Sequence, residues 1–272
     1  ILHSITMTLP QDAIKQLAEL SDFAESLADE AGSILRQHFR GNFQQEIKSD
    51  NTPVTEIDRQ VETALRNLIQ ARYPDHAITG EEFGQEAGQS DWQWVIDPID
   101  GTRAFIAGRD KFVTLIALCW KSKPVLGLID QPIRRHRWVG AQGHNTRFNG
   151  ITVTHQKLPQ HLVEATLGTT DASLFPPHAI PRFEALRDAC GSLRLGGDGY
   201  FYGLVSSGEE IQVVCEHGLK AHDFAALIPV LEHAGAIVTD WQGKPITLQS
   251  DGTILAATNA ALHTQALQQL AA

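Results

Sequence analysis

A short apolar run that ends in two aspartates around a proline constrains this chain more than any other stretch. It covers residues 94–102 and reads Trp-Val-Ile-Asp-Pro-Ile-Asp-Gly-Thr. The apolar start predicts a buried strand, and Pro98, which has no N–H group, predicts a sharp break after it. Asp97 and Asp100 would then project from one bend, with the Ile99 carbonyl between them. Hard oxygen ligands in such an arrangement suit Mg²⁺ and a substrate phosphate.

Gly101 and Thr102 close the same stretch. Glycine can take a positive φ or let a ligand approach the backbone closely. The N–H groups of both residues would lie at a helix start, where phosphate binds well. Two ordinary turns, Asp-Pro and Asp-Gly, explain the same letters, so these nine residues alone favour neither interpretation.

Two further acidic stretches lie on either side of the central run. Glu81 follows a short apolar segment and stands beside a second glutamate in a glycine-bounded loop. Asp223 begins an apolar helix predicted at 223–233. Taken singly, the first is typical of a solvated loop and the second of a helix N-cap.

Together, in this order and at this separation, the three stretches resemble the inositol monophosphatase family. The resemblance covers nearly the whole chain, and its implied fold is a five-layer αβαβα sugar-phosphatase sandwich, α/β overall with an α+β N-terminal half. Four further runs resemble the histidinol-phosphatase branch of the family, at residues 127–132, 137–140, 196–198 and 218–230.

The resemblance implies a metal site of up to three Mg²⁺ ions. Its ligands would be Glu81, Asp97, the Ile99 carbonyl, Asp100 and Asp223. Four carboxylates in one pocket repel one another unless cations offset them. Two or more metal ions can also clamp the attacking and leaving oxygens of an in-line displacement, and one of them would lower the pKa of the attacking water.

Thr102, Asp58 and Glu81 are the catalytic residues that the resemblance implies. Residues 55–72 read as a helix whose start resembles a capping box, so Asp58 could serve only the helix terminus. In the family, the aspartate at this place faces the metal site and pairs with the threonine that matches Thr102. Thr102 would position or deprotonate the attacking water, while the N–H groups of Gly101 and Thr102 hold the phosphate oxygens.

The predicted function is hydrolysis of L-histidinol phosphate to L-histidinol and phosphate in histidine biosynthesis. A substrate with an ammonium and an imidazole calls for extra carboxylates, and Asp198 and Glu216 are the candidates, with Arg103 beside them. The plainer interpretations are a helix cap for Asp198 and a solvated strand end for Glu216. Inositol-hydrolysing relatives usually have asparagine at the position of Ala104.

Two alternatives remain open at this point. One is an inositol-1-monophosphatase or a broad sugar- or nucleotide-phosphate hydrolase of the same family. The other, from a different class, is a catalytically inactive regulatory relative. His222 stands where family members often carry an aromatic residue, so an aromatic packing role is favoured over a metal ligand, because Mg²⁺ prefers oxygen.

Composition limits the partners. The net charge of −10 argues against a nucleic-acid partner, and no apolar run is long enough to span a membrane. Three cysteines without a Cys-x-x-Cys pair predict reduced thiols and a cytoplasmic enzyme. The family resemblance implies a homodimer. Met7 is a candidate native start, which would make residues 1–6 an addition.

The remaining pattern predicts two halves of one compact unit, residues 1–154 with most metal ligands and residues 155–272 with the substrate contacts. In the first half we predict helices at 12–39 and 55–72, an extended segment at 47–49, strands at 112–120 and 124–130, and hairpins at 139–153. In the second half, strands and helices alternate. The strands are predicted at 163–168, 211–215, 236–239 and 254–257, and the helices at 182–189, 200–206, 223–233 and 260–270.

Overall fold

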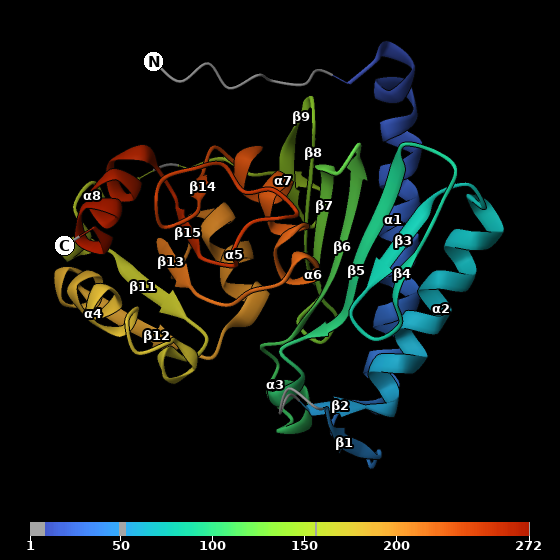
Figure 1. The fold of residues 1–272 in the computed structure, drawn as a ribbon, viewed down its shortest axis with the longest axis horizontal. Coiled ribbons are helices and arrows are strands. Elements are labelled where there is room, and N and C mark those ends of the chain that lie inside the picture. The colour runs from blue at the N-terminus through green and yellow to red at the C-terminus, as the bar shows by residue number, and fades with distance from the viewer. Residues whose placement is uncertain (1–8, 49–52, 156, 272) are drawn as a thin grey trace.

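The structure is a computed structural model that describes residues 9–48, 53–155 and 157–271. Within these residues the elements stack in five layers (Figure 1). One helix pair covers an eight-stranded sheet, a middle helical layer separates that sheet from a five-stranded sheet, and a second helix pair covers the smaller sheet. This order confirms the predicted αβαβα sandwich. Residues 1–6 and Met7 lie outside the described residues.

The first layer consists of α1 (Gln11–His38) and α2 (Glu56–Arg72), close to their predicted bounds. Their apolar residues recur at helical spacing and face the large sheet. The Thr55 hydroxyl accepts the N–H groups of Ile57 and Asp58, and the Asp58 carboxylate accepts the Thr55 N–H. The capping box that the sequence suggested at the start of α2 is therefore confirmed.

A small antiparallel ribbon connects these two helices. It pairs β1 (Gln45–Ile47) with β2 (Pro53–Thr55). Of the extended segment predicted at 47–49, Ile47 belongs to β1, and Ser49 lies outside the described residues.

The large sheet has the strand order β10-β9-β8-β7-β6-β5-β3-β4. Its pairs are antiparallel except β3 with β5, which run parallel, with Gly80 opposite Ile96. Because Gly80 lies opposite Ile96, the next residues along the two chain segments, Glu81 after β3 and Asp97 within β5, lie side by side. The strands span Ala77–Gly80 (β3), Gly84–Glu86 (β4), Trp92–Asp100 (β5), Val113–Trp120 (β6), Lys123–Gln131 (β7), His136–Ala141 (β8), His144–Phe148 (β9) and Ile151–Thr152 (β10).

The smaller sheet has the order β12-β11-β13-β15-β14 and mixes parallel with antiparallel pairs. Its strands span Thr166–Thr169 (β11), Ser192–Leu195 (β12), Val213–Glu216 (β13), Ile237–Thr239 (β14) and Ile254–Ala257 (β15). The middle layer holds Asp198–Ser207 (α5), Ala221–Phe224 (α6) and Leu227–Glu232 (α7), and the outer layer holds Ile180–Ala189 (α4) and Ala260–Leu270 (α8), with short 3-10 helices at Leu162–Glu164 (η1) and Ala172–Leu174 (η2).

Two predictions in this half were wrong in part, and one strand was not predicted. The helix predicted at 223–233 is two helices, because Pro229 has no N–H to bond the Ala225 carbonyl and the ladder is interrupted there. The strand predicted at 163–168 begins with the 3-10 helix η1. The edge strand β12 was not predicted, since only four residues carry its pattern.

Buried apolar side chains form three clusters. One lies between the helix pair α1–α2 and the large sheet, one surrounds the middle helices, and one lies between the smaller sheet and the helix pair α4–α8. Trp94 of β5 is fully buried under α1 and α2, and Phe224 of α6 is buried on the opposite side of the large sheet. Phe224 thereby holds α6 against β5 and fixes the residues next to it. No helix among the described residues is long and apolar enough to cross a membrane.

Candidate active site

A β-bulge in β5 brings Asp97 and Asp100 together. Side chains three residues apart in a regular strand point to opposite faces. Asp97 pairs with Leu115 of β6, whereas Asp100 pairs with Val113, so β5 holds one residue more than its partner over this interval. The sharp break predicted at Pro98 was therefore wrong in form: it is a bulge within a strand that continues to Asp100.

A cavity of about 480 Å³ opens over this bulge. Its walls come from β5, the short helix α3 (Thr102–Ile106), the starts of α5 and α6, and the loops after β3 and β11. The predicted site residues that line it are Glu81, Asp97, Ile99, Asp100, Gly101, Thr102, Arg103, Asp198 and Asp223. Asp171 and Arg109 also line it, and the sequence analysis missed both, because isolated charges in loops carry no pattern.

Two groups of side chains in this region could each hold a metal ion, because within each group the ligand atoms lie within 4.8 Å of one another. Glu81, Asp97 and His222 form one group, and Asp97, Asp100 and Asp223 form the other. Asp97 belongs to both groups, so two neighbouring cations could share its carboxylate.

The electrostatics of the cluster favour a bound cation. Burial holds the pKa of the Asp97 carboxyl well above its ordinary value, and the charges of Glu81, Asp100, Asp223 and Asp58 raise it further. Burial likewise raises the pKa values of Asp100 and Asp223. Since each influence on Asp97 disfavours its ionised form, a cation would offset all of them. The carboxylate oxygens fit Mg²⁺.

Two unusual backbone conformations shape the cavity wall next to the end of β5. Gly101 has a φ of +91°, and a Cβ there would lie 3.0 Å from Oδ2 of Asp198, so glycine lets this carboxylate approach. Asp198 itself has a φ of +43°, in the left-handed region that aspartate tolerates better than most residues. The next residue, Gly199, donates its N–H to Oδ2 of Asp100.

Thr102 stands between two oxygens of the site. Its hydroxyl lies 3.2 Å from Oδ1 of Asp58 and 3.0 Å from the Ile99 carbonyl oxygen. Asp58 is fully buried, and burial raises its pKa, although hydrogen bonds from Thr55 offset part of that rise. One oxygen of Asp58 therefore caps α2, and the other faces Thr102.

A lysine that the sequence analysis did not single out clamps the glutamate pair. Lys48 Nζ lies 2.8 Å from Oε1 of Glu81 and 2.6 Å from Oε1 of Glu82. Burial alone would lower the pKa of Lys48, but these two carboxylates raise it above its ordinary value. The Glu82 side chain is almost fully buried, so the plain interpretation of this pair as a solvated loop was wrong. Lys48 lies within the extended segment predicted at 47–49, but that pattern gives no sign of its two partners.

Glu216 lies behind the cavity wall and does not line the cavity. Its carboxylate accepts the Thr170 N–H and the Thr169 hydroxyl, which holds the end of β11 against β13. Burial raises the pKa of Glu216 to about 8, with the hydrogen bonds from Thr170 acting in the opposite direction. The interpretation as a solvated strand end was wrong, because the residue is only 4% exposed.

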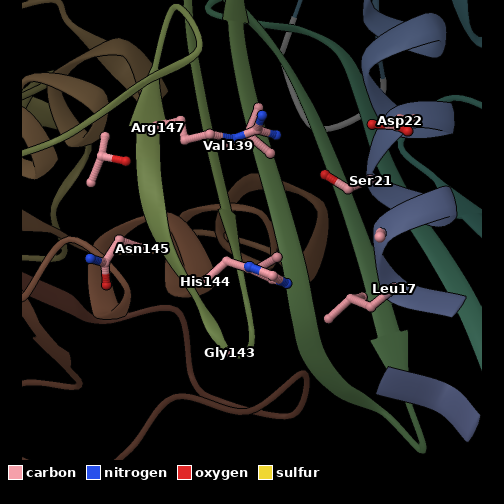
Figure 2. A pocket seen from close by; sticks show the side chains of 11 residues that line it. Leu17, Ser21, Asp22, Val139, Gly143, His144, Asn145 and Arg147 are labelled. Carbon is pink, nitrogen blue, oxygen red and sulfur yellow. The ribbon is translucent and has the colours of Figure 1, made fainter. Parts of the chain in front are cut away.

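A second cavity, of about 500 Å³, lies between α1 and the β8–β9 hairpin (Figure 2). In the close view, side chains of α1 face those of the hairpin across the opening: Leu17, Ser21 and Asp22 on one side, and Val139, His144 and Arg147 on the other. Among the described residues that line it, Asp22 is the only carboxylate. This cavity therefore lacks the ligand groups found over β5.

Fold and cavity together define a phosphatase architecture with an acidic candidate metal centre. The profile of the Inositol monophosphatase family matches residues 16–272. The chain therefore belongs to the inositol monophosphatase family, as the sequence resemblance implied, and is a phosphatase of that family.

The names of similar proteins point to two substrates, histidinol phosphate and inositol monophosphate. The chain is 41% identical over 264 residues to the bifunctional phosphatase IMPL2, chloroplastic, of Arabidopsis thaliana, covering 93% of this chain and 76% of that protein. It is 33% identical to the histidinol-phosphatase of Chlorobaculum parvum, covering 87% and 91%. A solved structure of an inositol monophosphatase from Zymomonas mobilis superposes with a TM-score of 0.84 at 41% identity, covering 94% of this chain and 98% of that one.

Proposed function

We propose that the protein is a Mg²⁺-dependent phosphomonoesterase that hydrolyses L-histidinol phosphate to L-histidinol and phosphate, as a step of histidine biosynthesis. The observation that carries the hydrolytic part is the carboxylate cluster over the β5 bulge, where Asp97 belongs to two potential ligand groups. The relative named histidinol-phosphatase supports the substrate.

The metal ligands in this proposal are those expected from the sequence. Glu81, Asp97, the Ile99 carbonyl, Asp100 and Asp223 would hold up to three Mg²⁺ ions. When bound, these ions would neutralise the phosphate and lower the pKa of the attacking water. Lys48 would hold Glu81 in place through its ion pair.

Thr102 and Asp58 would orient the attacking water. The buried Asp58 carboxylate can accept the Thr102 O–H, which leaves lone pairs of the threonine oxygen free to accept a hydrogen bond from water. Glu81 lines the same cavity as Thr102 and would complete the water site. The N–H groups of Gly101 and Thr102, at the start of α3, would bind phosphate oxygens as charge develops on them.

The substrate's ammonium group would lie against the part of the cavity wall formed by the start of α5 and the loop after β11. Asp198 and Asp171 provide carboxylates there. Hydrogen bonds from Ser173 lower the pKa of Asp171, and the charge of Arg103 adds to that effect. The same charge partly opposes the effect of burial on the pKa of Asp198. Burial raises the pKa of Asp198 to about 6, with the charge of Asp223 adding to that rise. A cationic substrate group would favour the ionised form of this carboxyl. Glu216 would act on this wall indirectly, by holding Thr170.

Inositol phosphate is the second candidate substrate. The solved Zymomonas mobilis structure, named an inositol monophosphatase, is as similar in sequence to this chain as the IMPL2 relative is. Hydroxyl groups of an inositol ring could also bind the carboxylates of the same wall.

Three coarser features complete the proposal. The first half, residues 1–154, would supply most metal ligands, and the second half, residues 155–272, would supply the substrate contacts. We propose a homodimer, so light scattering should give twice the 29.8 kDa chain mass at micromolar concentration, and a stable monomer would contradict it. We also propose that the enzyme acts in the cytoplasm, with Cys119, Cys190 and Cys215 as free thiols.

Steady-state kinetics on a small panel of phosphomonoesters tests the substrate. Purified protein with Mg²⁺ should give a kcat/KM for L-histidinol phosphate at least about tenfold above that for inositol 1-phosphate, which corresponds to about 1.4 kcal/mol. A preference for inositol 1-phosphate would reject the substrate and keep the phosphatase. No turnover of any phosphomonoester with Mg²⁺ would reject the hydrolytic function.

A further inference from the structure

His222 places an imidazole at the acidic centre. Its Nε2 lies 3.4 Å from Oδ1 of Asp223, and one of its ring nitrogens lies within 4.8 Å of carboxylate oxygens of both Glu81 and Asp97. The side chain is only 14% exposed, so it is held inside the site rather than directed to solvent. The sequence favours an aromatic packing role at this position. In the structure, the imidazole also lies close to carboxylate oxygens of Glu81, Asp97 and Asp223.

The position of His222 is fixed from two sides. Phe224, two residues on, is buried against the large sheet. Asp223 accepts the Lys220 N–H at 2.7 Å, which closes the first turn of α6. These two contacts hold the backbone of α6 on both sides of His222.

The two ligand groups therefore differ in chemistry. The group of Asp97, Asp100 and Asp223 offers oxygen only, which suits Mg²⁺. The group of Glu81, Asp97 and His222 offers two carboxylates and one imidazole nitrogen. Imidazole suits zinc and other transition metals, and affinity of such sites rises through the first-row series above that for Mg²⁺.

We propose that His222 is a nitrogen ligand that makes the Glu81 side of the site selective for a transition-metal ion such as Co²⁺ or Zn²⁺ over Mg²⁺. The inference rests on the proposed metal-dependent function and names the metal class for one part of that site. It replaces Mg²⁺ by a transition-metal ion at the position with mixed nitrogen and oxygen donors, and it keeps Mg²⁺ at the neighbouring position with oxygen donors alone.

Metal binding to the full-length protein tests this proposal without measuring turnover. Calorimetric titration with Co²⁺ and, separately, with Mg²⁺ is compared for wild type, His222→Phe and His161→Phe. Phenylalanine keeps an aromatic ring and removes the nitrogen. His161 is an exposed residue before η1, so its variant loses one histidine away from the site.

We expect His222→Phe to weaken Co²⁺ binding by about tenfold or more, since loss of even an outer partner of a metal ligand costs 10–100-fold. Mg²⁺ binding should change by less than about threefold, and His161→Phe should match wild type. Equal losses for both metals would overturn the proposal and leave His222 as a residue that only places Asp223. If wild type binds Mg²⁺ but shows no preference for Co²⁺, this inference falls while the proposed function stands.

A second measurement covers a variant that fails to fold. In wild-type protein labelled with ¹⁵N, addition of Zn²⁺ should shift one imidazole ring nitrogen of His222 strongly. An unshifted His222 nitrogen at saturating Zn²⁺ would overturn the proposal. Wild-type protein that binds neither Co²⁺ nor Mg²⁺ would overturn both this inference and the proposed function.

Discussion

The hydroxyl of Thr102 lies 3.2 Å from Oδ1 of Asp58, and the other oxygen of the same carboxylate caps helix α2. One buried side chain thus couples the start of a helix to the edge of the candidate active site. Asp58 and Thr102 are far apart in sequence, and α3 contacts β2, the strand that leads directly into α2.

This coupling predicts the effect of removing the hydroxyl. Thr102→Ala should lower kcat by roughly 10²-fold or more, the usual range for lost acid–base assistance, with a much smaller change in KM. Thr102→Ser keeps the hydroxyl and should retain most of the activity. Steady-state kinetics on L-histidinol phosphate or p-nitrophenyl phosphate measures both variants. A wild-type kcat in Thr102→Ala would remove Thr102 and Asp58 from the mechanism.

Removing one charge from the carboxylate cluster should separate activity from stability. Asp100→Asn keeps the shape of the side chain and an oxygen for the Gly199 N–H, but it lowers the repulsion that raises the pKa of Asp97. The metal-free variant should therefore melt at or above the wild-type temperature while losing activity. Calorimetry in chelator and a turnover assay in Mg²⁺ give the two values. Full turnover of chelator-treated wild type would rule out the metal mechanism.

The sequence indicates this site through three short stretches whose order and separation match a known family, although each stretch alone also has an ordinary structural interpretation. Asp97, Asp100 and Thr102 stand within six residues of one another, and an apolar strand leads into them. Glu81 follows the strand that pairs in parallel with β5, so the pairing carries it to the same edge. The run from Asp97 to Thr102 depends on neighbouring residues only, whereas the position of Glu81 also depends on the pairing of β3 with β5.

The remaining features depend on contacts between distant residues. Nothing local to Lys48 indicates that its ammonium reaches Glu81 and Glu82. The bulge in β5 is visible only from its register with β6. The burial of Glu216 follows from the pairing of β13 with β11 and from the Thr170 N–H, and a strand end in sequence gives no sign of either.

The close approach of Gly199 to Asp100 gives a prediction that tests the cavity wall. A Cβ on Gly199 would lie 2.5 Å from Oδ2 of Asp100, and the carboxylate would have to move. Gly199→Ala should therefore weaken Mg²⁺ binding by about tenfold or more, by analogy with the loss of outer partners of metal ligands. Isothermal titration calorimetry measures this.

Gly203→Ala on the same helix is the matched control. Its Cβ would meet the Trp138 ring at 2.7 Å, away from the carboxylates. This variant should melt at a lower temperature, because overpacking a core typically costs 1–3 kcal/mol, while Mg²⁺ affinity stays within about twofold. Equal losses of Mg²⁺ affinity in both variants would show that α5 responds as a unit and that the Asp100 contact is not special.

Glu216 predicts a specific dependence of stability on pH. Its pKa is about 8 in the folded protein and 4.5 ordinarily. Between these values the folded state binds the additional proton, so this group's contribution to stability falls as pH rises from about 5 to 8. The glutamine of Glu216→Gln stays neutral at every pH. The stability of this variant relative to wild type should therefore rise between about pH 5 and 8 by an amount on the order of a few kcal/mol.

The measurement is the melting temperature of variant and wild type in chelator, from pH 5.5 to 8.5. Taking the difference removes the titration of the metal-site carboxylates, which both proteins share. Glu209→Gln, at an exposed position, should show no pH-dependent difference. A constant difference for Glu216→Gln across the whole range would mean that Glu216 is ionised throughout.

The last prediction concerns how the site selects a substrate with an ammonium group. Asp198 lines the cavity and faces Gly101 closely, whereas Glu216 lies behind the wall with its oxygens already bonded to Thr169 and Thr170. A charge-assisted hydrogen bond contributes about 1.5–3 kcal/mol, so Asp198→Asn should lower kcat/KM for L-histidinol phosphate by roughly ten- to a hundredfold. With p-nitrophenyl phosphate, which has no ammonium, the change should be less than about threefold.

Glu216→Gln provides the contrast, because its carboxylate contacts Thr169 and Thr170 instead of the cavity. The decrease in kcat/KM caused by Glu216→Gln should be smaller than that caused by Asp198→Asn on L-histidinol phosphate. It should be similar for the two substrates, since Glu216 acts through the position of the end of β11. An equal decrease in kcat/KM on both substrates for Asp198→Asn would instead show that Asp198 supports the metal ligands. Its charge raises the pKa of Asp100, and the charge of Asp223 raises its own pKa. Kinetics of the two variants on the two substrates thus separates a substrate contact from support of the metal site.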